Sequence, residues 1–306
     1  MSARSSGARC AKRAGVPEAS SAVSPAALQG RPRPRRARRL GTLVALWLAA
    51  LLAPALVAAG QVAAPDEGTA SDQGTASDEG ADTLQLAGPD EAELAVPMHE
   101  AIYHASVSGI PVRAGMRLQR QEGRYYLFES WVEPRGLLSF ISRELSEQSL
   151  LTLDTRNRVI PISYRKRDEF GGRDSDIRFE PLEGEMRIRF RGDETTREWS
   201  PGTYDLLSLR LALAHDMARG SLADVYGVVD DRSRVEQVDV QVAGRETLST
   251  ELGELETVRL EYRSERRDRL FRLWLAPGMD MALVQLEQYE EGRLRGRLKI
   301  VEYRRL

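Results

Sequence analysis

The three histidines of this chain are the side chains best suited to bind a metal, and their positions argue against a metal site. His99 and His104 lie five residues apart, so on one β-strand they face opposite sides of a sheet. His215 falls on the polar side of a predicted helix. Because a metal site needs several ligands that converge on one point, we predict no metal site and no cofactor.

The acidic residues alternate with arginines along predicted strands, where cross-strand ion pairs on a solvated face are their ordinary role. The sequence lacks a glycine-rich phosphate loop, a G-x-S-x-G nucleophile elbow and an H-E-x-x-H metal motif. The single cysteine, Cys10, lies in a basic leader, so the mature protein has no thiol for catalysis, disulfides or thiolate metal sites. We therefore expect no catalytic residues and no enzyme; a hydrolase with paired carboxylates is the enzymatic alternative.

Arg210 is the one charged residue within the apolar arc of the predicted helix. Its side chain either reaches solvent or pairs with a carboxylate of the sheet. The alternative is that it is a cation in an apolar groove, where it receives the acidic head group of a ligand. The role of Arg210 stays open at the level of sequence.

The helix that carries Arg210 is predicted over about residues 205–219. Asp205 is a suitable N-cap, and Gly220 tolerates the positive φ of the residue after a helix. Apolar residues cover roughly 200° of its circumference: Leu206, Leu207, Leu209, Leu211, Leu213, Ala214, Met217 and Ala218. The polar remainder comprises Ser208, His215, Asp216 and Arg219.

Strand patterns surround this helix on both sides. Residues 111–119 alternate strictly, with Val112, Ala114, Met116 and Leu118 on one face. Further strands are predicted within 124–133, 149–154, 158–167, 176–182, 185–192, 235–244, 246–265, 268–278, 281–292 and 293–305. Short turns without helices separate them, which favours an antiparallel meander whose apolar face must be covered. The sequence thus predicts a mainly β fold: a curved antiparallel sheet, or incomplete β-barrel, wrapped around one central α-helix.

The first 59 residues have the pattern of a basic leader and secretory signal peptide. An uncharged apolar run over 41–59 follows an arginine cluster, and Val57 and Ala59 fit the small residues before a cleavage site. We predict cleavage after Ala59 and a periplasmic location; an uncleaved N-terminal anchor is the alternative. Residues 60–96, which repeat GTASD, predict a disordered acidic linker, and residues 97–306 a single domain.

Charge is distributed unevenly along the chain. Residues 1–60 hold ten basic residues and one acid, and residues 61–96 hold nine acids and no base. Of the totals of 44 basic and 46 acidic residues, 34 and 36 remain for residues 97–306. The domain is therefore nearly neutral, which argues against nucleic acid as a partner.

The order of motifs resembles the bacterial exported family called domain of unknown function 3108 (DUF3108). The resemblance rests on YHASVSGIPVRAGMRLQ, on the helix YDLLSLRLALAHDMARG, and on two later strand pairs that begin with VQVAGRETLSTELGE and FRLWLAPGMDMALVQ. It implies a periplasmic protein of unsettled function. More loosely, the architecture is similar to half-barrel lipoprotein carriers, which shelter acyl chains between a curved sheet and helices.

Three hypotheses for function follow. The first is a non-enzymatic periplasmic module that binds an apolar or lipid-like molecule, or an envelope protein, in its groove. The second is a structural or assembly factor of the cell envelope without a small ligand, and the third is a hydrolase. A large apolar cavity beside Leu211 and Met217 would favour the first, and a fully packed interior the second. No ligand-binding residue is assigned from the sequence.

Overall fold

The computed structural model describes residues 84–88, 90–107, 109–134, 145–169, 172–230, 233–264 and 268–306. The leader with Ala59 lies outside these ranges, as does the linker up to residue 83. Within the described ranges, no helix is both long and apolar enough to cross a membrane.

The packed domain begins before residue 97. Ala87, Leu94 and Val96 are buried, and the N–H of Ala87 donates to the carbonyl of Leu153 at 3.0 Å. The predicted disordered linker through residue 96 is therefore wrong for residues 84–88 and 90–96. The reason is that this part of the chain, unlike the acidic repeats before it, carries apolar side chains that add to the core.

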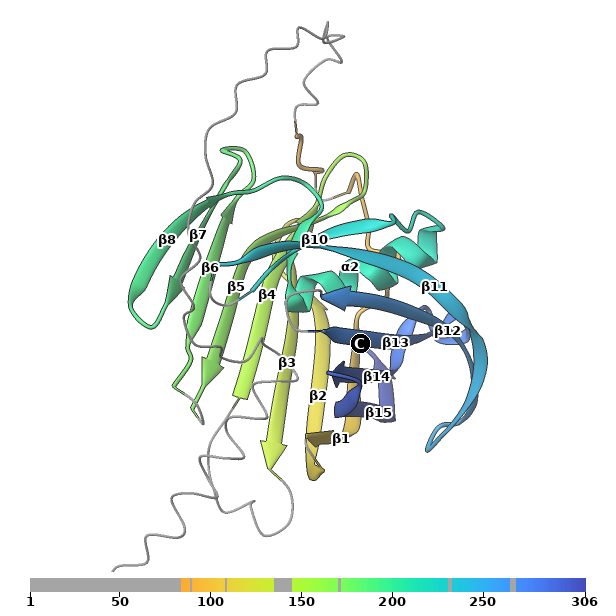
Figure 1. The fold of residues 1–306 in the computed structure, drawn as a ribbon. Coiled ribbons are helices and arrows are strands. Elements are labelled where there is room, and N and C mark those ends of the chain that lie inside the picture. The colour runs from red at the N-terminus through yellow and green to blue at the C-terminus, as the bar shows by residue number, and fades with distance from the viewer. Residues whose placement is uncertain are drawn as a thin grey trace, which may run out of the picture. The chain divides into compact units, whose positions relative to one another are not determined.

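Fifteen strands form one sheet in the order β8-β7-β6-β5-β4-β3-β2-β1-β15-β14-β13-β12-β11-β10-β9 (Figure 1). The strands are β1 (His99–Val107), β2 (Ile110–Arg120), β3 (Tyr126–Pro134), β4 (Leu145–Leu153), β5 (Val159–Asp168), β6 (Ser175–Glu180), β7 (Glu185–Phe190), β8 (Asp193–Glu198), β9 (Thr203–Asp205), β10 (Val225–Val229), β11 (Val235–Thr250), β12 (Gly253–Ser264), β13 (Arg269–Ala276), β14 (Ala282–Glu290) and β15 (Arg293–Arg305). A short 3-10 helix, η3 (Pro277–Met279), connects β13 to β14. The sheet is the predicted antiparallel meander, except that β9 and β10 pair in parallel.

Two features give the sheet its incomplete-barrel form. The first described strand, β1, pairs with the last, β15, over a register that runs from His99 opposite Arg305 to Val107 opposite Gly296. The ladder stays open between β8 and β9, although β9 lies against β5. Strands β6–β8 extend beyond this contact, at the left of Figure 1. The predicted mainly β fold around one helix is confirmed.

The central helix, α2 (Leu206–Arg219), begins and ends as its sequence predicts. The Asp205 carboxylate accepts the N–H groups of Leu207 and Ser208 at 2.9 Å each, and Gly220 has φ 68°. The helix connects β9 to β10, which allows these two strands to run parallel.

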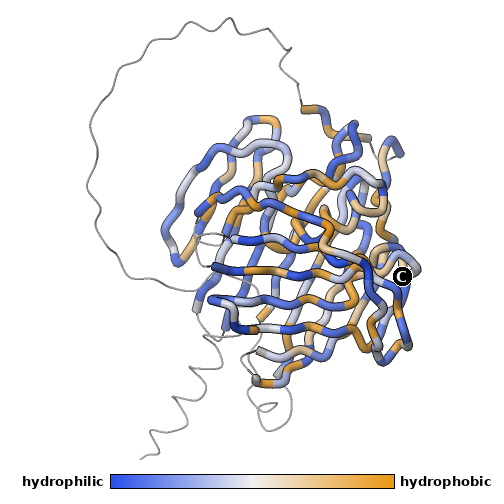
Figure 2. The backbone as a smooth tube through the Cα atoms, turned by 45° about the vertical axis from the view of Figure 1, so that its right-hand side comes forward, coloured by the Kyte–Doolittle hydropathy of each residue, from blue (hydrophilic) through white to orange (hydrophobic). Residues whose placement is uncertain are grey.

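Burial of α2 exceeds the predicted apolar arc. Every residue from Leu207 to His215 is buried, so placing Ser208 and His215 on a polar side of the helix is wrong. The physical reason is that the curved sheet contacts α2 through several strands, namely β3, β4, β5, β9 and β10. Most of the strands keep the alternation of apolar and polar residues that gives a strand an inner and an outer face (Figure 2), whereas β8 is polar and almost wholly exposed.

Candidate functional site

A small cavity lies beside α2 where the N-terminal and C-terminal strands meet, and we call it the α2 cavity. Its volume is about 30 Å³, enough for a few water molecules at most. Its lining is mostly apolar: Val96, His99, Tyr103, Met116, Phe128, Arg210, Leu211, Ala214, Leu273, Leu275, Met281, Ala282 and Leu283. Met281 and Leu283 are only half-buried, so the cavity reaches the boundary with solvent.

Irregular pairing occurs on two sides of this cavity. The β1–β15 register shifts between Ile102 and Tyr103, and the β13–β14 register shifts next to Leu275, which pairs with Leu283. The Tyr103 hydroxyl donates to the carbonyl of Leu283 at 3.1 Å and thereby joins the two irregularities. Such bulges redirect side chains and are frequent next to binding sites.

Arg210 is the one charged side chain that lines the α2 cavity. It is only 6% exposed, yet its Nε and Nη1 have no hydrogen-bond partner among the described residues. Nε and Nη1 are therefore shielded from solvent, and no ion pair joins Arg210 to a carboxylate of the described residues. A buried, unpaired guanidinium is costly, and proteins seldom retain one without a counter-ion.

Glu147 on β4 and Lys166 on β5 form a buried charged pair on the inner face of the sheet. They lie opposite each other in the strand register, and both are fully buried. The Tyr164 hydroxyl donates to Glu147 Oε1 at 2.7 Å, whereas Glu147 Oε2 has no hydrogen-bond partner in the described structure. Burial raises the pKa of Glu147, and the charges of Lys166 and Arg210 oppose that rise.

Asp205 is the second buried carboxylate of this region, and its hydrogen-bonding capacity is filled. Its Oδ1 caps α2, and its Oδ2 accepts the hydroxyls of Ser208 at 2.7 Å and Ser149 at 2.9 Å. Burial is the main cause that raises the pKa of Asp205, and these hydrogen bonds counteract it. Ser149 thus fixes the start of α2 against β4.

Glu147 and Lys166 were not predicted from the sequence, because the alternation of acids with arginines assigned such charges to solvated strand faces. The alternation of inward-facing and outward-facing positions along β4 and β5 would have identified them as buried. Glu147 is two residues from Leu145 and four from Leu151, both fully buried, so all three face inward. Lys166 is likewise in phase with buried Tyr164.

The three histidines do not converge. His99 is buried, lines the α2 cavity and hydrogen-bonds the carbonyl of Pro97 through Nδ1 at 2.9 Å; burial lowers its pKa. His104 lies on the other face of β1, where its Nδ1 is 3.1 Å from Glu251 Oε1. His215 is buried at the far end of α2.

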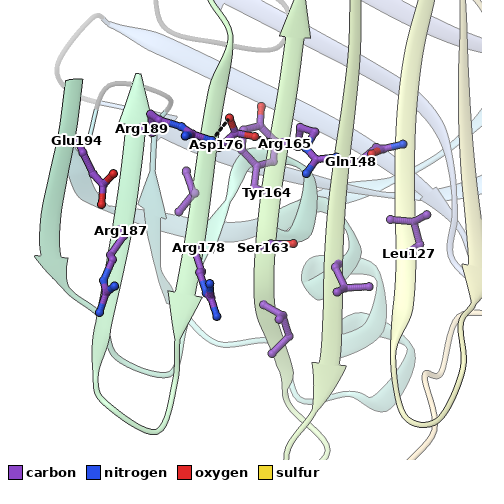
Figure 3. A pocket seen from close by; sticks show the side chains of 13 residues that line it. Leu127, Gln148, Ser163, Tyr164, Arg165, Asp176, Arg178, Arg187, Arg189 and Glu194 are labelled. Carbon is purple, nitrogen blue, oxygen red and sulfur yellow. Dashed lines mark hydrogen bonds and ion pairs between the residues drawn. The ribbon is translucent and has the colours of Figure 1, made fainter. Parts of the chain in front are cut away.

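A larger, open groove of about 730 Å³ lies on the opposite face of strands β3–β8 (Figure 3). Its arginines are paired, unlike Arg210. Asp176 is bonded by Arg165, Arg167 and Arg189, and Glu180 lies 3.1 Å from Arg187. Burial alone would raise the pKa of Asp176, but hydrogen bonds and charge from these arginines lower it. The groove is also lined by apolar residues such as Leu150 and Ile162, but its charged side chains pair with one another. We therefore place the candidate site at the α2 cavity, where a charged side chain has no such partner.

Carboxylates come together at one further place. Glu180, Glu183 and Glu185 present oxygen atoms within 4.8 Å of one another at the β6–β7 turn. A hydrogen bond with the carboxylate of Glu180, and the negative charge of Glu180, raise the pKa of Glu183. The cluster is mostly exposed, and such surface acids are common without a metal.

Residues 102–292 match a family described as "Protein of unknown function (DUF3108)". The chain belongs to the DUF3108 family. The resemblance drawn from the sequence motifs is thereby confirmed, and the match spans the helix α2 and both runs of strands that form the α2 cavity. A search of curated proteins found no match for this DUF3108 protein.

Several solved structures show weak similarity to this DUF3108 protein. One is a "Beta-barrel-like Protein of Domain of Unknown Function DUF1849" from Brucella abortus, with 14% identity and a TM-score of 0.47, covering 70% of this chain and 100% of that chain. Another is a "putative exported protein with YmcC-like fold" from Bacteroides fragilis, with 10% identity, a TM-score of 0.24 and coverages of 70% and 97%. A third is a "putative lipoprotein" from Parabacteroides distasonis, with 10% identity, a TM-score of 0.25 and coverages of 70% and 99%. Similarity this weak carries no information about function.

Proposed function

We propose that this DUF3108 protein is an exported, non-enzymatic binding module of the cell envelope that holds an apolar or lipid-like molecule against α2. The observation that carries the proposal is the α2 cavity, where apolar side chains from α2, β1–β3 and β13–β14 converge around one unpaired cation. Binding sites for small molecules have this composition of apolar walls with a few polar groups. The signal-like leader supports export to the periplasm.

The present cavity is smaller than an acyl chain, so binding requires movement at its boundary. Met281 and Leu283 are the half-buried residues there, and Met281 has φ 61°, an unusual value for a side chain of its size. Methionine is flexible and adapts to different ligands. Displacement of the β13–β14 connection would extend the cavity toward solvent.

A second candidate is a structural or assembly factor of the envelope without a small ligand. The small volume of the α2 cavity favours it, since the interior beside Leu211 is nearly filled and Met217 does not line the cavity. The third hypothesis, a hydrolase with paired carboxylates, has less support. The two buried carboxylates near α2, Glu147 and Asp205, line neither the α2 cavity nor the open groove.

Native mass spectrometry of the protein purified gently from periplasm tests the first candidate. We expect a co-purified lipid with wild type and its loss in Ala214→Phe, because the added ring fills the cavity that Ala214 lines. Ala218→Phe is the matched control, since Ala218 is exposed on the same helix. Protein without lipid in every preparation would favour the structural factor.

A further inference from the structure

We propose that Arg210 binds the anionic head group of the ligand in the α2 cavity, and that this ligand is a long-chain carboxylate. The inference rests on the proposed function and adds the chemical class of the ligand. It starts from the contrast between Arg210 and the other deeply buried arginines.

Arg269 shows how this protein otherwise accommodates a buried guanidinium. It is 4% exposed, close to the 6% of Arg210, but its Nε and Nη2 both donate to Glu290 Oε1 at 3.3 Å. Arg210 directs two nitrogen atoms, Nε and Nη1, into surroundings that offer no acceptor within the described structure. The positive charge of Arg210 therefore lacks the partner that Arg269 has.

Neither of the internal carboxylates near Arg210, those of Glu147 and Asp205, forms a hydrogen bond with Arg210 Nε or Nη1 in the described structure. Glu147 lies opposite Lys166 in the sheet and accepts the Tyr164 hydroxyl. Asp205 accepts four hydrogen bonds, two from backbone N–H groups and two from serine hydroxyls. Glu147 Oε2 has no hydrogen-bond partner, and the charge of Glu147 interacts with that of Arg210, but no hydrogen bond or ion pair joins the two side chains. A carboxylate in direct contact with Arg210 therefore has to come from outside the described residues.

The site favours a carboxylate over a phosphate. The flat fork of a guanidinium donates two parallel hydrogen bonds to a planar carboxylate. Arg210 supplies one positive charge, which a ligand with one negative charge balances. The nearby Glu147, whose charge interacts with that of Arg210, disfavours a second negative charge on the ligand. The apolar residues that line the rest of the cavity, such as Leu211, Leu273 and Met281, suit an alkyl chain attached to the carboxylate.

Binding of defined alkyl probes to purified protein at pH 8 tests the inference. The probes are hexadecanoate, hexadecanol, hexadecyl phosphate and acetate, each at concentrations below micelle formation. The variants are Arg210→Leu, Arg210→Lys, and Arg178→Leu as a control, since the Arg178 side chain is 78% exposed in the open groove. Thermal unfolding shows that each variant is folded, and we expect Arg210→Leu to unfold at or above the wild-type temperature, because it removes a buried charge without a partner.

We expect wild type to bind hexadecanoate more tightly than hexadecanol. Arg210→Leu should weaken hexadecanoate binding by about 10- to 100-fold, the value of a charge-assisted hydrogen-bond pair, and leave hexadecanol unchanged. Arg210→Lys keeps the positive charge but loses the two parallel donors of the guanidinium. Its affinity for hexadecanoate should therefore lie between those of wild type and Arg210→Leu. Arg178→Leu should bind all probes as wild type does.

Other outcomes separate the inference from the proposed function. Equal affinity for acid and alcohol, or unchanged hexadecanoate binding in Arg210→Leu, overturns the head-group assignment and leaves the binding module intact. Tighter binding of hexadecyl phosphate overturns the carboxylate class. If acetate binds as tightly as hexadecanoate, or if no alkyl probe binds, the proposed function itself fails.

Discussion

At the scale of single residues, this protein places polar side chains in its interior and provides many of them with hydrogen-bond partners, whereas Arg210 and Gln288 keep buried atoms without a partner in the described structure. His215 shows how completely such a group can be satisfied. Its Nδ1 accepts the N–H of Ala95 at 3.0 Å, and its Nε2 lies 2.8 Å from the carbonyl of Asn157, so the neutral ring donates from Nε2. One imidazole thus holds α2, the N-terminal segment and the β4–β5 turn together.

Replacing His215 by glutamine should change how stability depends on pH. Burial lowers the pKa of His215 from 6.5, so the unfolded chain binds more protons than the folded protein as pH falls below that value. The stabilisation is complete above about pH 6.5 and is lost as the pH drops toward the folded-state pKa, by at most about 1.4 kcal/mol per pH unit. Urea unfolding between pH 5 and 8 measures this. The free energy of unfolding should fall less at acidic pH in His215→Gln than in wild type.

The matched control for this measurement is His104→Gln, whose side chain lies on the outer face of β1. It should leave the free energy of unfolding at pH 8 close to the wild-type value, because the side chain is 46% exposed. His99, whose pKa burial also lowers, contributes in the same direction in all three proteins and cancels in the comparison. If the free energy of unfolding depends on pH in the same way in wild type and His215→Gln, the assignment of a neutral, hydrogen-bonded ring is contradicted.

At the scale of elements, close approach between side chains and backbone fixes how neighbouring strands pack. Gly115 on β2 is paired with Trp131 on β3, and the indole covers the glycine so closely that a Cβ would lie 2.1 Å from Trp131 Cζ2. The Arg117 guanidinium lies 5.6 Å from the centroid of the same ring. Trp131 therefore covers part of the outer surface of β2 that a side chain at position 115 would occupy.

Gly115→Ala should lower the free energy of unfolding by about 1–3 kcal/mol, because the methyl group displaces the indole from β2. Denaturant unfolding measures this loss. Gly278→Ala is the control, since a Cβ there meets nothing within 4 Å and the backbone has no positive φ. Combining Gly115→Ala with Trp131→Ala should add little to the loss from Trp131→Ala alone; full additivity would argue against the contact.

At the scale of the whole molecule, the strand order keeps both ends of the folded chain in the middle of the sheet. β1 pairs with β15, while the open edges belong to β8 and β9, which are consecutive in sequence. β8, DETTRE, is charged and mostly exposed, which discourages edge-to-edge association. The first described strand of the chain is therefore an inner strand of the sheet and not an edge strand.

Cleavage after Ala59 predicts a periplasmic protein whose N-terminus is Gly60. Intact-mass analysis of periplasmic extract measures this directly. Ala59→Tyr should retain the leader and shift the protein to the membrane fraction, because a bulky residue does not fit the position before a cleavage site. Full-length wild-type protein in the membrane fraction would instead establish the uncleaved anchor.

The sequence by itself determined the local elements of this protein. Alternation predicted most of the strands, Asp205 and Gly220 predicted both ends of α2, and the order of motifs predicted the family. These signals are local, since a strand or a helix cap is specified by residues within a few positions of one another. Strands β1, β8, β9 and β10 were not predicted from the sequence. Strand β8 is polar throughout, and β9 and β10 are too short to show a clear alternation.

Only the tertiary structure decided which polar residues are buried. His215 and Ser208 lie on the polar side of an isolated helix, and Glu147 and Lys166 resemble ordinary strand charges, yet all four are fully buried. The reason is that burial depends on what packs against a residue from distant parts of the chain, and here the sheet curls around α2 from several sides. The same curl brought Arg210 beside strands of both halves of the sheet and left its charge without a partner in the described chain.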